Sequence, residues 1–97
     1  MAAAGDADGG AAFVYLLRCA DGSYYTGWTS DLQRRLAAHQ AGRGARYTRS
    51  RLPVMLAYCE QHPSRTDARK REAALRRQSH AKKDALAAEQ NGHQVGS

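Results

Sequence analysis

The fold is decided by residues 13–28, which read FVYLLRCADGSYYTGW. Residues 13–19 form a short run of apolar, β-branched and aromatic side chains, and residues 23–28 form a second run that is rich in aromatic rings. Both compositions are typical of β-strands. The residues between them, Ala20-Asp21-Gly22, favour a tight turn. The stretch therefore predicts a β-hairpin.

The length of this turn determines which side chains share a face of the hairpin. A two-residue turn places Tyr15 and Tyr25 on opposite faces, because side chains alternate along a strand. A three-residue turn, with Gly22 in the left-handed conformation, pairs Tyr15 with Gly27 and places both tyrosines on one face. The sequence leaves both registers open.

A helix is predicted after the hairpin. Ser30 followed by Gln33 three residues later is a capping-box pattern, and the helix ends by Gly42. Residues 42–51 are mostly Gly, Arg, Ser and Thr, so they predict a flexible basic loop. A strand over residues 54–60 follows.

Two further helices complete the predicted order β-β-α-β-α-α. One begins at Ser64, with Asp67 as the acidic partner of a second capping box, and runs to about residue 77. The other covers residues 80–88. The fold class is therefore α/β (α+β), with a small three-stranded mixed or antiparallel sheet flanked by helices.

The composition supports a single small domain. Of the 97 residues, 42% are hydrophobic and 25% are charged, which is too apolar for a disordered chain and enough for one modest core. We expect residues 11–88 to form this domain, with disordered tails at 1–10 and 89–97. No apolar run approaches the ~20 residues of a membrane span, and the first residues do not resemble a secretory leader. We therefore expect a cytoplasmic protein.

The two cysteines predict no metal site or disulfide framework. Cys19 and Cys59 lie in apolar runs, without CxxC spacing or a nearby cluster of ligands. We expect both to be buried thiols in a reducing compartment.

Positive charge is concentrated in the middle of the chain. The net charge is +6, but residues 32–83 contain 14 lysines and arginines against Glu60, Asp67 and Glu72, a difference of +11. Such a segment attracts a polyanion, and nucleic acid is the first candidate because every nucleotide carries a phosphate. A membrane surface is the weaker alternative.

Arg35 and His39 are four residues apart on the first predicted helix, so they share a face. That face borders the apolar stripe made by Leu32 and Leu36. The two side chains either extend along the helix edge toward solvent or belong to a site at the border of the core.

Glu72 lies on the apolar line of a strongly basic helix, together with Ala68 and Leu75. A carboxylate on the packed side of such a helix needs a partner. A salt bridge to Arg69 or Arg76 is one explanation. The other is coordination of a hard divalent cation, which prefers carboxylate oxygen and water.

Together these residues resemble a GIY-YIG nuclease domain. The resemblance rests on Phe13-Val14-Tyr15, Tyr25-Thr26-Gly27, the pair Arg35 and His39, and Glu72. Residues 14–22, 45–49 and 52–54 are similar to the small stand-alone bacterial branch of that family, and the match covers residues 11–86. Phe13 stands where the family motif has a glycine and Thr26 where it has an isoleucine, both at backbone or packing positions.

The resemblance implies an endonuclease that hydrolyses phosphodiester bonds with Mg²⁺ or Mn²⁺, the ion being held by Glu72. The catalytic residues that it implies are Tyr15, Tyr25, Arg35 and His39. We assign Tyr15 as the general base and expect Arg35 and the metal to lower its pKa. The residues expected to contact nucleic acid are Arg43, Arg46, Tyr47, Arg49, Arg51 and Lys83.

DNA is favoured over RNA as the substrate, with a role in DNA repair or processing, and we expect a monomer or a weak homodimer that does not bind membranes. The alternative is a non-catalytic nucleic-acid-binding module, in which the arginines of residues 43–51 contact phosphates and Tyr47 stacks on a base. A structural adaptor for an acidic protein is a third reading, but it gives no purpose to the Tyr, Arg, His and Glu set.

Overall fold

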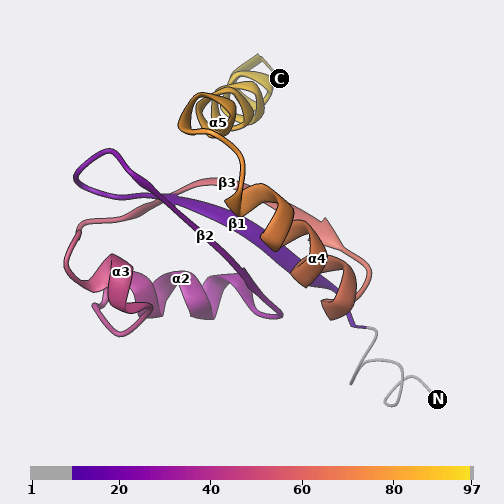
Figure 1. Cartoon of the computed structure of the whole chain (residues 1–97), viewed down its shortest axis with the longest axis horizontal. Coiled ribbons are helices and arrows are strands. Elements are labelled where there is room, and N and C mark those ends of the chain that lie inside the picture. The colour runs from indigo at the N-terminus through magenta and orange to yellow at the C-terminus, as the bar shows by residue number, and fades with distance from the viewer. Residues whose placement is uncertain (1–9, 97) are drawn as a thin grey trace.

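The computed structural model describes residues 10–96. Three strands form one sheet in the order β2-β1-β3, and β1 is antiparallel to both of its neighbours. In chain order the elements are β1 (Ala12–Arg18), β2 (Tyr24–Thr29), α2 (Leu32–Gln40), α3 (Arg46–Arg49), β3 (Met55–His62), α4 (Arg65–Arg76) and α5 (His80–Gly96). The predicted order β-β-α-β-α-α is confirmed, with the short α3 added to it (Figure 1).

The turn between β1 and β2 has three residues. Gly22 has a φ of 84°, in the left-handed region that favours glycine. Tyr15 consequently pairs with Gly27, and Leu17 pairs with Tyr25. The three-residue alternative is therefore confirmed, and the two tyrosines share one face of the sheet.

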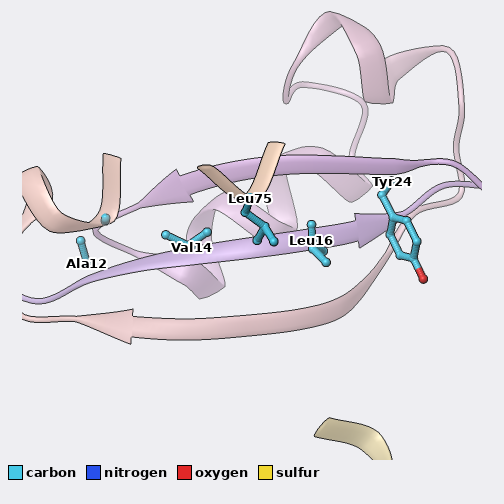
Figure 2. Packing of buried hydrophobic residues seen from close by; sticks show 6 residues of the cluster. Ala12, Val14, Leu16, Tyr24 and Leu75 are labelled. Atoms are coloured by element: carbon cyan, nitrogen blue, oxygen red, sulfur yellow. The ribbon is translucent and has the colours of Figure 1, made fainter. Parts of the chain in front are cut away.

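Alternate side chains of β1 enter two hydrophobic clusters, one on each face of the sheet. Val14 and Leu16 are completely buried in a cluster with Leu75 of α4 (Figure 2). Tyr15 lies in the other cluster, against which Leu36 of α2 packs. Each fully buried leucine contributes on the order of 2 kcal/mol of hydrophobic free energy. The central strand thus holds α2 and α4 against opposite faces.

The first helix begins one residue later than predicted. Asp31 is the N-cap, and its Oδ1 accepts the N–H of Arg34 at 3.1 Å. The N–H of Asp31 donates to the Thr29 hydroxyl at 3.1 Å, which fixes the chain just before the helix. The prediction of Ser30 as N-cap is wrong because the charged Asp31 carboxylate is the acceptor that meets the helix N-terminus.

The segment predicted as a loop, residues 42–51, contains the helical turn α3. The hydroxyl of Thr48 donates to the Ala45 carbonyl at 3.0 Å, within this turn. Arg51 Nε donates to the Asp21 carboxylate at 3.1 Å, which ties the segment to the β1–β2 turn. Because that partner lies far away in the chain, the local composition does not reveal the order of the segment.

Helix α5 continues to Gly96, so the structure places residues 89–96 in a helix in place of the predicted tail. The side-chain amide of Gln90 accepts the N–H of Cys59 at 3.2 Å and donates to its carbonyl at 2.9 Å. β3 is an edge strand, and this amide satisfies backbone groups that have no neighbouring strand. The predicted N-terminal tail lies outside the described residues, apart from Gly10.

Both cysteines are free thiols, Cys19 buried and Cys59 partly buried. Burial raises the pKa of both thiols, which favours the unreactive protonated form. Within residues 10–96, no helix combines the length and the apolar character needed to cross a membrane.

Candidate active site

The candidate active site is built around Gly27 on the edge strand β2. Tyr15 is 1% exposed, and its hydroxyl lies directly over Gly27, its partner across the hairpin. A β-carbon at position 27 would lie 2.6 Å from the Tyr15 hydroxyl oxygen, closer than side chains approach one another. Gly27 therefore allows the hydroxyl to reach the sheet edge, where residues from both faces come near it.

His39 of α2 contacts this hydroxyl directly. Its Nε2 lies 2.9 Å from the Tyr15 hydroxyl oxygen, and the histidine is completely buried. The His39 ring also lies 5.1 Å from the Tyr25 ring, centroid to centroid. The structure thus brings Tyr15, Tyr25 and His39 together, whereas the alternative of a histidine that extends toward solvent does not apply.

The electrostatic surroundings keep this pair neutral. Burial raises the pKa of the Tyr15 hydroxyl above its ordinary value of 10.0, and the Glu72 charge raises it further. The Arg35 guanidinium lowers that pKa, as expected, but burial outweighs it. Burial and then the Arg35 charge lower the pKa of His39 below its ordinary value of 6.5. A phenol therefore faces a neutral imidazole at neutral pH.

Glu72 approaches the site from α4, on the opposite face of the sheet. It is 8% exposed and forms an ion pair with Arg76, one of the two partners considered from the sequence. The same Arg76 Nη2 donates to the backbone carbonyl of Thr26 at 3.5 Å. Arg76 therefore holds two oxygen atoms at one point, and the Glu72 charge is felt at the Tyr15 hydroxyl, whose pKa it raises.

These oxygen atoms fit a hard divalent cation. The Glu72 carboxylate and the Thr26 carbonyl converge on one positively charged nitrogen of Arg76, and the buried Thr26 hydroxyl has no hydrogen-bond partner among the described residues. Among the side chains that the structure describes, residues 10–91, no group of three or more His, Cys, Asp or Glu is suited to a metal. A cation held by Glu72 would keep mostly water and substrate oxygens, as Mg²⁺ commonly does.

The residues expected to bind nucleic acid divide into two groups. Arg43, Arg46 and Arg49 are exposed. Arg51 instead lies 3.8 Å over the ring centroid of Tyr47, which is 37% exposed, and pairs with Asp21. Both groups lie in residues 42–51. The side chains of Arg51 and Tyr47 already contact each other within the protein, whereas the other three arginines are exposed.

A hollow of about 270 Å³ lies next to the site. It is lined by Tyr24, Tyr25, Thr26, Tyr47, Arg76 and Lys83. Burial and then the neighbouring Arg76 lower the pKa of Lys83, whose Nζ donates to the Arg76 carbonyl at 3.3 Å. Aromatic rings and two basic side chains thus line the space beside Glu72.

Two residues of the site were not singled out from the sequence. The hydroxyl of Thr48 lies 2.9 Å from His39 Nδ1, and Thr48 is completely buried. Gly44 packs against the His39 ring so closely that a β-carbon there would collide with Nδ1. The stretch 45–49 is part of the family resemblance, but nothing in its composition connects Thr48 with a histidine on another helix.

Comparison with known proteins identifies the family of the chain. The model of the GIY-YIG catalytic domain matches residues 11–85. A UPF0213 protein from Streptococcus sanguinis (strain SK36) is 54% identical over 68 residues, which cover 70% of this chain and 78% of the relative. A UPF0213 protein from Halobacterium salinarum is 51% identical over 73 residues, which cover 75% and 95%.

The fold also matches a solved structure. The solution NMR structure of a UPF0213 protein from Bacillus halodurans is 41% identical, with a TM-score of 0.51 over 80% of this chain and 83% of that one. The match to the family model covers the sheet, the helices α2 to α4 and every residue of the site. The chain therefore belongs to the GIY-YIG family, whose domains are generally nucleases, and its relatives include the small UPF0213 proteins.

Proposed function

We propose that the protein is a divalent-metal-dependent endonuclease that hydrolyses phosphodiester bonds, with DNA favoured over RNA and a role in DNA repair or processing. The observation that carries the proposal is the buried contact between the Tyr15 hydroxyl and His39 Nε2, 2.9 Å apart, beside Arg35 and within the field of Glu72. Binding alone has no use for such a contact, whereas hydrolysis needs a path for a proton.

Tyr15 activates the attacking water in this proposal. The water gives a proton to the Tyr15 oxygen as its own oxygen attacks phosphorus, and the phenolic proton of Tyr15 passes to His39 Nε2. Since burial raises the pKa of Tyr15, the phenol is neutral before the reaction and needs an acceptor in contact. The leaving oxygen takes a proton from solvent, and His39 later returns its extra proton to the Tyr15 oxygen, which releases a proton to the water that enters the site. Tyr25 orients the water.

Arg35 and Glu72 act on the phosphate group of the substrate. The planar guanidinium of Arg35 binds the phosphate oxygens and spreads their negative charge. A Mg²⁺ or Mn²⁺ ion at Glu72 would neutralise charge on these oxygens and stabilise the leaving oxygen. Arg76 must leave the Glu72 carboxylate before a cation binds there, which frees its charge for the substrate.

The exposed arginines 43, 46 and 49 and the partly buried Lys83 would hold the nucleic acid beside the site. Because Arg51 covers Tyr47, base stacking on Tyr47 requires rearrangement of that pair. The basic surface serves a binding module equally well, so only the site separates the two functions.

A substrate panel tests the proposal. The purified chain is incubated with labelled single-stranded, duplex and flap DNA and with the matching RNA molecules, in EDTA, Mg²⁺ or Mn²⁺. We expect cleavage of at least one DNA substrate with a divalent ion and none in EDTA. Tight binding to these nucleic acids without cleavage in any condition contradicts the proposal and supports the binding module.

A further inference from the structure

The Thr48 hydroxyl connects His39 to the backbone of α3. Its oxygen lies 3.0 Å from the Ala45 carbonyl oxygen and 2.9 Å from His39 Nδ1. A carbonyl oxygen only accepts hydrogen bonds, and a hydroxyl has a single hydrogen. The Ala45 carbonyl accepts the Arg49 N–H at 3.1 Å with one lone pair and the Thr48 hydroxyl with the other. Toward His39 the Thr48 oxygen then acts as an acceptor, which places a hydrogen on His39 Nδ1.

This assignment determines the other ring nitrogen. A neutral imidazole carries one hydrogen, so with Nδ1 protonated Nε2 has a free lone pair. That lone pair meets the Tyr15 hydroxyl at 2.9 Å, which therefore donates. The three successive hydrogen bonds therefore all run in one direction. Tyr15 donates to His39, His39 donates to Thr48, and Thr48 donates to the Ala45 carbonyl.

The surroundings of His39 support the neutral form. Tyr15 and Tyr25 face the ring from the sheet, Thr48 faces it from α3, and Arg35 is the charged neighbour on its own helix. A positive ring beside Arg35, away from water, would be unfavourable. Gly44 lies against the ring, where a β-carbon would collide with Nδ1.

We infer that Thr48 is a positioning residue that holds His39 in the tautomer with hydrogen on Nδ1, so that Nε2 accepts the Tyr15 proton. The catalytic part of this inference rests on the proposed function. In the opposite tautomer a hydrogen on Nε2 points at Tyr15, and the phenol loses its acceptor. Thr48 is completely buried, so in this inference it acts through His39 alone.

The tautomer is measured directly by ¹⁵N NMR of the histidine rings, at neutral pH and without metal or nucleic acid. In the wild-type protein we expect Nδ1 of His39 to show the shift of a protonated nitrogen and Nε2 that of an unprotonated one. A hydrogen on Nε2, or on both nitrogens, overturns the inference without any variant.

Two matched variants test the role of the hydroxyl. Thr48→Ser keeps the hydroxyl and should keep the tautomer, whereas Thr48→Val keeps the shape and should give a mixture of tautomers or the opposite one. An unchanged His39 pattern in a folded Thr48→Val protein, with native amide shifts, contradicts the role of Thr48. Should Thr48→Val not fold, a shifted tautomer in folded Thr48→Ser equally contradicts it.

Cleavage kinetics separate this inference from the proposed function. Thr48→Val should lower kcat by about 10- to 100-fold with little change in KM, and Thr48→Ser should remain near wild type. If His39 shows the expected tautomer but the protein cleaves no nucleic acid, the inference about the position of His39 stands and the proposed function is contradicted. Full activity of Thr48→Val with a disturbed tautomer contradicts the catalytic part of the inference.

Discussion

The hydroxyl of Tyr15 lies 2.9 Å from Nε2 of His39, although 24 residues separate them in the sequence. A strand and a helix make this contact possible, because the three-residue turn places Tyr15 on the face that α2 covers and over a glycine. Tyr15 is 1% exposed and His39 is completely buried, so the contact lies at the inner end of the site. Several measurable consequences depend on it.

His39 should make the stability of the protein pH-dependent. Because the pKa of His39 is lowered in the folded state, the unfolded chain binds more protons than the folded one between the folded value and about 6.5. The free energy of unfolding is thus fully maintained above pH 6.5 and falls as the pH drops through this window. Urea unfolding at several pH values should show a smaller pH dependence for His39→Asn than for wild type. An equal pH dependence would contradict neutral burial of His39.

Glu60 should stabilise the protein through Arg71, outside the site. The single N–H of Arg71 Nε is shared between the two oxygens of the Glu60 carboxylate, and Nη2 donates to one of them. Burial raises the pKa of Glu60, but the hydrogen bonds from Arg71, Tyr58 and His62 outweigh it and lower the pKa to about 2. The free energy of unfolding should therefore be fully present above about pH 4.5 and be lost as the pH falls toward 2. Glu60→Gln should cost on the order of 2 kcal/mol at pH 7 and less at pH 3. Chemical unfolding measures this, with Glu89→Gln as an exposed control; an unchanged free energy would rule out the pair as a stabiliser.

Substitution of Glu72 should remove the metal-dependent activity, whereas substitution of Arg76 should strengthen metal binding. Glu72→Gln should abolish cleavage and leave nucleic-acid binding equal or tighter, since a negative charge near phosphate is removed. Arg76→Ala should strengthen Mn²⁺ binding, measured by calorimetry, because the competing cation has gone. Arg69→Ala, in an exposed arginine of the same helix, should leave Mn²⁺ affinity unchanged. Activity of Glu72→Gln equal to wild type at saturating Mg²⁺ would show that Glu72 is only an ion-pair partner.

The exposed arginines should contribute affinity that depends on salt. Each phosphate contact adds about 0.7 to 0.9 to the slope of log K against log salt, so replacing Arg46 and Arg49 with alanine should flatten the slope by roughly one to two. Replacement of Arg51 should instead lower the melting temperature, because it pairs with Asp21 and stacks on Tyr47. Fluorescence anisotropy at several salt concentrations measures the slope. If it is the same for the double variant and wild type, the nucleic acid binds another surface.

Most of the fold could be predicted from local patterns, and the errors have physical causes. The hairpin, the order of the elements and the Ser64 cap follow from short-range rules, and the Ser64 hydroxyl indeed accepts the Asp67 N–H at 3.1 Å. The turn length could not be chosen, because both turns satisfy the same local sequence. The continuation of α5 past residue 88 brings Gln90 to the edge of β3, a contact that no local pattern encodes.

For the candidate site, too, the sequence predicts some features and not others. Helical spacing places Arg35 and His39 on one face and Glu72 on the packed side of its helix, and the structure agrees. The upward net shift of the Tyr15 pKa could not be predicted, since it depends on how deeply the ring is buried. The bond from His39 to Thr48 connects two helices across a turn, so only the folded chain reveals it.

The most direct test of Tyr15 as the base compares Tyr15→Phe with Tyr25→Phe in single-turnover cleavage. Phenylalanine keeps each ring and removes one hydroxyl, so packing is nearly unchanged. We expect Tyr15→Phe to lower the cleavage rate by about 10²- to 10⁴-fold with little change in affinity or melting temperature, and Tyr25→Phe to lower it less. A Tyr15→Phe protein that cleaves as fast as wild type, or that loses less activity than Tyr25→Phe, would contradict the assignment of Tyr15 as the base.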